Sequence, residues 1–419
     1  MAFETFPAKS RGEIRFAAFV VASGVAVGVL YHLNLWMPDA TGFSMLQGRL
    51  PYWDFTNLWA GSKIAFEGHA GVLFDVDAYR AALRVMFSPD LPNQEWSYPP
   101  SMALFGAPLA QLPILVAYLL WTFGTVALLH VAIRPLGLPL AAHLAVLASP
   151  AVFMNAFFGQ NGALTAALLL GGLLVAPKRP ILAGILFGLL TVKPHLGILV
   201  PFCLIASLNW RAFVSAAATS AALALATGLI FGFESWRLFL SETRPLMTAI
   251  MEAPYPQHYH ANALTVFVLA RAAGGGLATA YAAQAVATVA TVAVVVWLWL
   301  PSNPMDHRRR SLLTALLAIV ATPYGYTYDM IPMCAAIVFL FVATPKPPLA
   351  PLALAWLFPY AAHILNFHGI GIGVLVPIAL AIWMVARAPI LRQSSASDPA
   401  DTGTVEMSER IRTVVTESR

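Results

Sequence analysis

Long apolar segments, separated by short basic or polar turns, run through almost the whole sequence. Residues 16–36 and 277–300 contain no Asp, Glu, Lys or Arg, and each is long enough to cross a bilayer as a helix. Only 10% of the residues are charged, against roughly 25% in a soluble domain. The pattern predicts an all-α polytopic membrane protein. Because no small-residue cleavage site follows residues 16–36, we expect that segment to be a retained span.

Hydropathy predicts about 12 transmembrane helices within residues 16–393. They are flanked by a cytoplasmic N-terminus, residues 1–15, and a polar, disordered cytoplasmic tail, residues 394–419. The expected spans are 16–36, 113–133, 138–154, 160–176, 180–192, 195–208, 211–232, 277–300, 311–323, 329–344, 348–365 and 369–387. Residues 99–112 form a further apolar segment, which is either re-entrant or the leading part of the second span.

Basic residues set the expected orientation, because Lys and Arg concentrate on the cytoplasmic side of a membrane. If both termini are cytoplasmic, the basic turns at 178–179 and 308–310 lie inside as well. Polar-aromatic clusters then fall on the opposite side, at 52–57, 97–100, 157–162, 192–195, 256–262, 322–329 and 363–369. We therefore expect one extracytoplasmic site. We also expect the membrane to be a bacterial inner membrane.

Two long extracytoplasmic loops are expected, residues 38–98 and 233–262. The first loop contains two helical patterns. In the earlier one, apolar residues such as Phe55 and Leu58 form a stripe, while Asp54 and Asn57 share a neighbouring face. Helices of this kind usually lie along the membrane interface, so we expect interfacial helices here.

Three charged residues are candidates for chemistry, and each has a structural alternative. Asp54 either caps a helix that starts at Phe55 or acts as a base whose proton affinity is tuned by apolar neighbours. Asp329 either caps a later span or is a second catalytic carboxylate. Lys193 lies in an apolar segment, where it either reaches the headgroups or binds a phosphate.

Polar residues of the remaining clusters are candidates for binding. His258 and His260 are either ordinary surface histidines or donors to a phosphate oxygen, and no third ligand at zinc-site spacing accompanies them. The pair Asp75 and Asp77 gives only a weak metal-binding pattern. We expect no metal site and no cofactor, although a divalent metal is not excluded. Candidate sugar or acceptor contacts are Asn57, Tyr98, Gln160, Asn161 and Tyr328.

The order of these motifs resembles glycosyltransferase family 87. An aspartate follows the first span, then come Tyr-Pro-Pro at 98–100, Gly-Gln-Asn-Gly at 159–162, Lys-Pro at 193–194 and the late segment 323–329. The resemblance covers most of the membrane part, from Asp54 to Asp329. This chain has Lys-Pro-His at 193–195 where Lys-Pro-Gln is usual in the family. The loop histidines and the acceptor-facing residues also vary in the family, so the identity of the acceptor does not transfer.

The resemblance implies a GT-C type helical bundle that uses a polyprenyl-phosphate sugar, with mannose as the family default. The implied roles are general base for Asp54, and phosphate binding for Lys193 with His258 or His260. The acceptor would be a glycolipid or a glycan, and the bilayer would be the other partner; nothing suggests nucleic acid. Two alternatives stay open: a flippase or transporter of lipid-linked sugars, and a non-catalytic lipid-binding scaffold.

Overall fold

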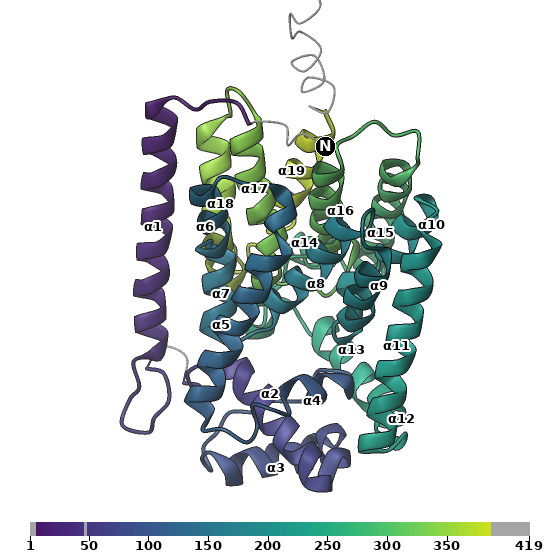
Figure 1. Cartoon of the computed structure of the whole chain (residues 1–419). Coiled ribbons are helices and arrows are strands. Elements are labelled where there is room, and N and C mark those ends of the chain that lie inside the picture. Colours follow the sequence, from purple (N-terminus) through teal and green to yellow (C-terminus); the bar gives the residue numbers. More distant parts are fainter. Residues whose placement is uncertain (1–5, 46–47, 387–419) are drawn as a thin grey trace, which may run out of the picture. The chain divides into compact units, whose positions relative to one another are not determined.

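The computed structural model describes residues 6–45 and 48–386, and over these ranges the regular structure is helical (Figure 1). Backbone pairing there is limited to isolated bridges such as Ala263 with Tyr326. The chain divides into two compact units, residues 1–378 and 379–419. Of the second unit, the described residues comprise only the end of α19 (Leu375–Ala386). The predicted tail, 394–419, lies outside the described residues.

Helices overlap all twelve predicted spans. Six are long and apolar enough to cross a membrane: Arg11–Trp36, Ile114–Leu136, Leu140–Phe158, Trp210–Phe231, Leu277–Trp299 and Leu349–Phe367. They are α1, α5 with a short 3-10 turn, α6 with α7, α11, α15 and α18. The prediction of an all-α polytopic membrane protein is confirmed.

The other predicted spans are shorter helices. They are α8 (Gly162–Val175), α9 (Pro180–Leu189), α10 (Val200–Ala206), α16 (His307–Ala321), α17 (Ile331–Ala343) and α19. Almost every residue of α8, α16 and α17 is buried, whereas long helices such as α1 and α11 leave most of their residues uncovered. The short helices α8, α16 and α17 therefore form the buried centre of the first unit, residues 1–378, and the long helices provide much of its apolar outer surface.

The first long loop folds around its own first helix. The loop contains α2 (Trp53–Ile64), α3 (Val76–Met86) and short π and 3-10 turns. The sequence predicts an apolar stripe on one face of α2, but the helix is buried on nearly all sides. One reason is that residues 94–106 wrap over it: an added Cβ at Gly61 would lie 2.3 Å from the Trp96 ring. The following helix, α3, is amphipathic, with Tyr79 and Leu83 buried.

The apolar segment 99–112 does not span. It forms α4 (Ser101–Gly106), which is followed by turns that lead to α5 (Ile114–Ala132). A helix of six residues rises about 9 Å, far less than the ~30 Å of a bilayer core. Contact with α2 is close, since a Cβ at Gly106 would lie 2.1 Å from Ser62 Oγ.

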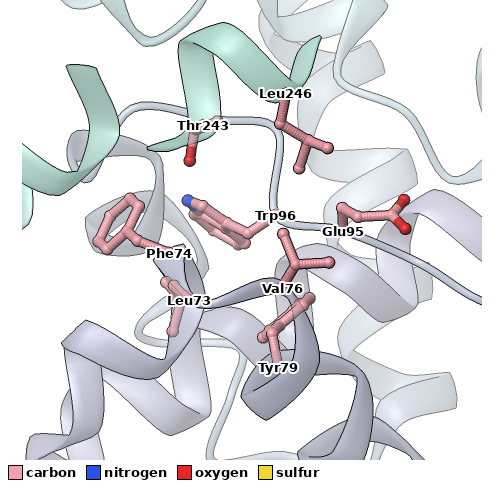
Figure 2. Close-up of a pocket in the computed structure, with 8 residues that line it drawn as sticks. All are labelled: Leu73, Phe74, Val76, Tyr79, Glu95, Trp96, Thr243 and Leu246. Atoms are coloured by element: carbon pink, nitrogen blue, oxygen red, sulfur yellow. The ribbon is translucent and has the colours of Figure 1, made fainter. Parts of the chain in front are cut away.

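The two long loops meet at one end of this unit. The second loop contains α12 (Glu234–Leu238) and α13 (Arg244–Glu252), and residues of both loops line a small cavity (Figure 2). Figure 2 shows Thr243 of the second loop beside the Trp96 indole of the first. The indole nitrogen is buried and has no hydrogen-bond partner in the described chain. None of the candidate site residues lines this cavity.

The close approach of Gly61 to Trp96 gives a stability prediction. Gly61→Ala should lower the free energy of unfolding by about 1–3 kcal/mol, because the fully buried indole has little room to move. Thermal unfolding of the detergent-solubilised protein measures this. Gly71→Ala in the same loop is the control, since an added Cβ there meets nothing within 4 Å. An unchanged midpoint for Gly61→Ala would show that the contact is not tight.

Candidate active site around Asp54

Three segments far apart in the sequence meet beside the start of α2. The turn after α7 (Pro150–Phe158) lies between α2 and the short 3-10 helix Thr327–Asp329. A Cβ at Gly159 would lie 2.4 Å from Phe55 Cβ, and one at Gly162 would lie 2.1 Å from the Tyr328 carbonyl oxygen. Gly159 also has φ +65°, a conformation that favours glycine. These two glycines let the backbones approach closely enough to gather one site.

Asp54 is not the cap of α2. The helix begins at Trp53, its N-cap residue is Tyr52 with φ 49°, and no side chain caps it. Asp54 is therefore the second helical residue, and its side chain is half-buried. A non-glycine residue with positive φ is uncommon and is often found at functional sites.

The surroundings of Asp54 tune its acidity. Burial raises the pKa of Asp54 from 3.8 to about 6, the largest of several effects. A hydrogen bond with Gln160 and the positive charges of Arg49 and Lys193 oppose that rise. A carboxylate with a pKa near the operating pH can accept a proton without being too weak a base.

Lys193 forms a buried ion pair with Asp329. Its ammonium lies 2.7 Å from Asp329 Oδ1, and the two side chains are 6% and 0% exposed. The lysine sits where the helical segment of α9 breaks before Pro194. Since it is enclosed and paired, Lys193 does not reach out to headgroups. The structure thus joins two residues that are 136 positions apart.

Aromatic rings surround this ion pair. The Lys193 ammonium lies 4.9 Å from the centroid of the Tyr328 ring and 5.8 Å from that of Tyr326. These distances are within the range of cation–π attraction. Asp329 Oδ2 accepts a hydrogen bond from the Tyr326 backbone N–H at 3.2 Å.

Tyr98, Gln160 and Asn161 lie together, and Gln160 also bonds to Asp54. The Tyr98 hydroxyl donates to Gln160 Oε1 at 3.4 Å, and Trp121 Nε1 donates to the Gln160 carbonyl at 3.1 Å. Asn161 is buried, and neither of its amide atoms has a hydrogen-bond partner of good geometry among the residues described. A buried amide without partners is costly unless something else bonds to it.

Asn57 and His260 are occupied elsewhere. Asn57 Nδ2 donates to the Glu95 carbonyl at 2.9 Å, and Asn57 Oδ1 accepts from the Tyr79 hydroxyl. His260 Nδ1 accepts from the Gln257 backbone N–H at 3.0 Å, and its Nε2 faces a backbone carbonyl. Both residues therefore hold their loops together. The side chain of His258 lies outside the described part of the structure.

Three residues near the site, Tyr326, Tyr259 and Arg49, are not among the candidates that the sequence indicates. Tyr326 contacts Lys193 and Asp329, and its hydroxyl bonds to that of Tyr259 in the second long loop. Arg49 influences the charge of Asp54 from within the first loop. The aromatic cluster 322–329 could have drawn attention to Tyr326, but a single arginine in a loop carries no sequence signal.

The Asp75 and Asp77 pair, a weak metal-binding pattern in the sequence, has a structural explanation. Asp75 caps α3, because its side chain accepts from the backbone N–H groups of Asp77 and Ala78. Within residues 6–45 and 48–386, no three His, Cys, Asp or Glu side chains group together as metal ligands would.

Comparison with protein families decides the relationship of this chain. The model of glycosyltransferase family 87 matches residues 96–323, more than half of the chain. The chain belongs to glycosyltransferase family 87. The matched region includes Tyr98, Gln160, Asn161 and Lys193, while Asp54 precedes it and Asp329 follows it. No curated protein and no solved structure matches this family 87 chain.

The Lys193–Asp329 pair gives a second stability prediction. Lys193→Met or Asp329→Asn should each destabilise the fold by about 3–5 kcal/mol, because each leaves an unpaired buried group. The double variant Lys193→Met/Asp329→Leu should recover much of the loss. Thermal unfolding measures all three.

Arg237→Gln is the matched control for these variants. It breaks an ion pair with Glu234 that is largely exposed, so it should change the unfolding midpoint little. If the Lys193 and Asp329 variants were as mild as this control, the pair would not stabilise the fold.

Proposed function

We propose that this membrane glycosyltransferase transfers a sugar from a polyprenyl-phosphate donor to a glycolipid or glycan, with mannose as the first sugar to test. The observation that carries the proposal is the half-buried carboxylate of Asp54, which does not cap α2 and has a pKa of about 6. Membership of family 87 supports the reaction class. A GT-C type fold and an inverting reaction are parts of the same proposal.

In the proposed reaction, Asp54 is the general base. It takes the proton of an acceptor hydroxyl as that oxygen forms a bond to the anomeric carbon of the sugar. The bond from this carbon to the phosphate oxygen breaks, and its electron pair leaves with polyprenyl phosphate. Attack from the face opposite the leaving group inverts the anomeric centre, as in inverting glycosidases with a hydroxyl in place of water.

Lys193 is proposed to bind the donor phosphate. An ammonium has three N–H donors, so Lys193 can bond to Asp329 and still offer hydrogen bonds to a phosphate oxygen. The nearby residues Gln160, Asn161, Tyr98 and Tyr328 are proposed to contact the sugar or acceptor. His260 is left out of this machinery because both ring nitrogens face backbone groups. No cofactor is part of the proposed reaction.

The proposed topology places the site outside the cytoplasm of a bacterium, with both termini inside. Its support is the distribution of Lys and Arg between the apolar segments. The two long loops lie together, at the same end as the start of α2. A polyprenyl-linked donor would reach this site from the outer leaflet of the inner membrane.

The direct test is transfer of radiolabelled mannose from polyprenyl-phosphate-mannose in membranes that contain the protein. Wild type should label a lipid or glycan, and Asp54→Asn should lose at least about 100-fold in rate, because a general base typically contributes 10²–10⁴-fold. The amide has nearly the same size as the carboxylate and no capping role is lost.

Two results would change the proposal. If Asp54→Asn labels as well as wild type, Asp54 is not the base and Asp329 becomes the candidate. If wild type labels nothing in the presence of host acceptors and alternative pentose donors, the donor class is wrong and transport of a lipid-linked sugar should be measured.

The acidity of Asp54 predicts the pH dependence of transfer. Because the base must be ionised and burial raises its pKa to about 6, kcat/KM should fall about tenfold per pH unit below pH 6. The pH profile of initial transfer rates measures this limb. Arg49→Gln should move the limb to higher pH, since the Arg49 charge lowers the pKa of Asp54. A profile that is flat down to pH 4.5 would contradict this assignment.

A further inference from the structure

The ion pair at the site leaves a charge problem for any bound phosphate. Lys193 and Asp329 are 2.7 Å apart, so together they carry no net charge. A phosphate placed against Lys193 would also lie near the Asp329 carboxylate, and like charges at such distances repel strongly when buried. Lys193 can offer hydrogen bonds, but an uncompensated positive charge must come from another residue.

Arg49 has the required properties. Its side chain is half-buried, and its guanidinium lies 5.1 Å from the centroid of the Trp53 ring. Trp53 is the residue directly before Asp54 in the chain. Within the described residues, it has neither an ion pair with a carboxylate nor a side-chain hydrogen bond. This cation–π contact holds the guanidinium beside Trp53 while leaving its N–H groups available.

The N-terminus of α2 reinforces this charge. The helix begins at Trp53, the same residue whose ring Arg49 contacts, and no side chain caps it. The first N–H groups of a twelve-residue helix and its dipole favour an anion at this end. Arg49, which makes no ion pair with a carboxylate within the described residues, therefore lies beside the uncapped start of α2, and its positive charge also acts on Asp54 in the first turn.

We propose that Arg49 and the N-terminus of α2 bind the phosphate ester of a lipid substrate, with Lys193 contributing hydrogen bonds rather than net charge. This inference rests on the proposed function for its substrate class. The phosphate belongs either to the polyprenyl donor or to a phospholipid acceptor, and both sources present the same group to a guanidinium.

Binding to the full-length protein in detergent tests this without any transfer reaction. Two ligand pairs are compared: a polyprenyl phosphate with the matching polyprenol, and phosphatidylinositol with diacylglycerol. Arg49→Gln should raise the Kd for a phosphate-bearing lipid by roughly tenfold, and leave that for its uncharged counterpart unchanged. Arg49→Lys should recover most of the affinity because it keeps the charge.

Arg84→Gln is the matched control. Arg84 is an exposed arginine of the same loop that bonds to Asn93, and its removal should not change any Kd. An effect of Arg49→Gln on polyprenyl phosphate assigns the site to the donor, and an effect only on phosphatidylinositol assigns it to the acceptor. Unchanged affinity for both lipids overturns the inference.

The same experiment separates this inference from the proposed function. If wild type binds polyprenyl phosphate no better than polyprenol, the proposed donor class fails, while the phosphatidylinositol pair still decides the role of Arg49. Suppose instead that wild type binds polyprenyl phosphate better than polyprenol, and that Arg49→Gln leaves the Kd of every lipid in both pairs unchanged. Only the assignment of Arg49 then fails.

Discussion

The buried pair of Lys193 and Asp329 is the interaction on which the rest of the site depends. An isolated ammonium or carboxylate in this position would be costly to desolvate, and each group offsets the cost of the other. The pair joins the break after α9 to the segment before α17, so it also fixes the position of α9 relative to the buried helix α17. The aromatic rings around it exclude water and strengthen its attraction.

Close backbone contact brings the third element, the start of α2, to this pair. The glycines at 159 and 162 lie against Phe55 and the Tyr328 carbonyl, and neither contact leaves room for a side chain. Asp54 consequently lies near the charged pair although it belongs to a loop outside the long helices. Its raised pKa is a result of the same enclosure that makes the ion pair necessary.

The sequence predicted the helices better than it predicted the contacts between them. Apolar segments such as 277–300 specify helices directly, because the bilayer permits few other structures. The sequence indicates Lys193 and Asp329 separately as candidates, but their pairing depends on how the chain folds across 136 positions. The helical periodicity places Asn57 on the same face as Asp54, and that periodicity equally suits a residue that packs a loop. Arg49 has no surrounding pattern, so only its position over Trp53 identifies it.

Tyr326 connects parts of the molecule that would otherwise act separately. Its backbone N–H bonds to Asp329, its ring faces Lys193, and its hydroxyl bonds to Tyr259 of the second long loop. Any ligand that shifts this loop must therefore alter the surroundings of the ion pair. By thermodynamic reciprocity, a ligand held at the ion pair alters the loop by the same coupling free energy. Two ligands, one bound at the second long loop and one at the ion pair, would therefore change each other's affinity by the same factor.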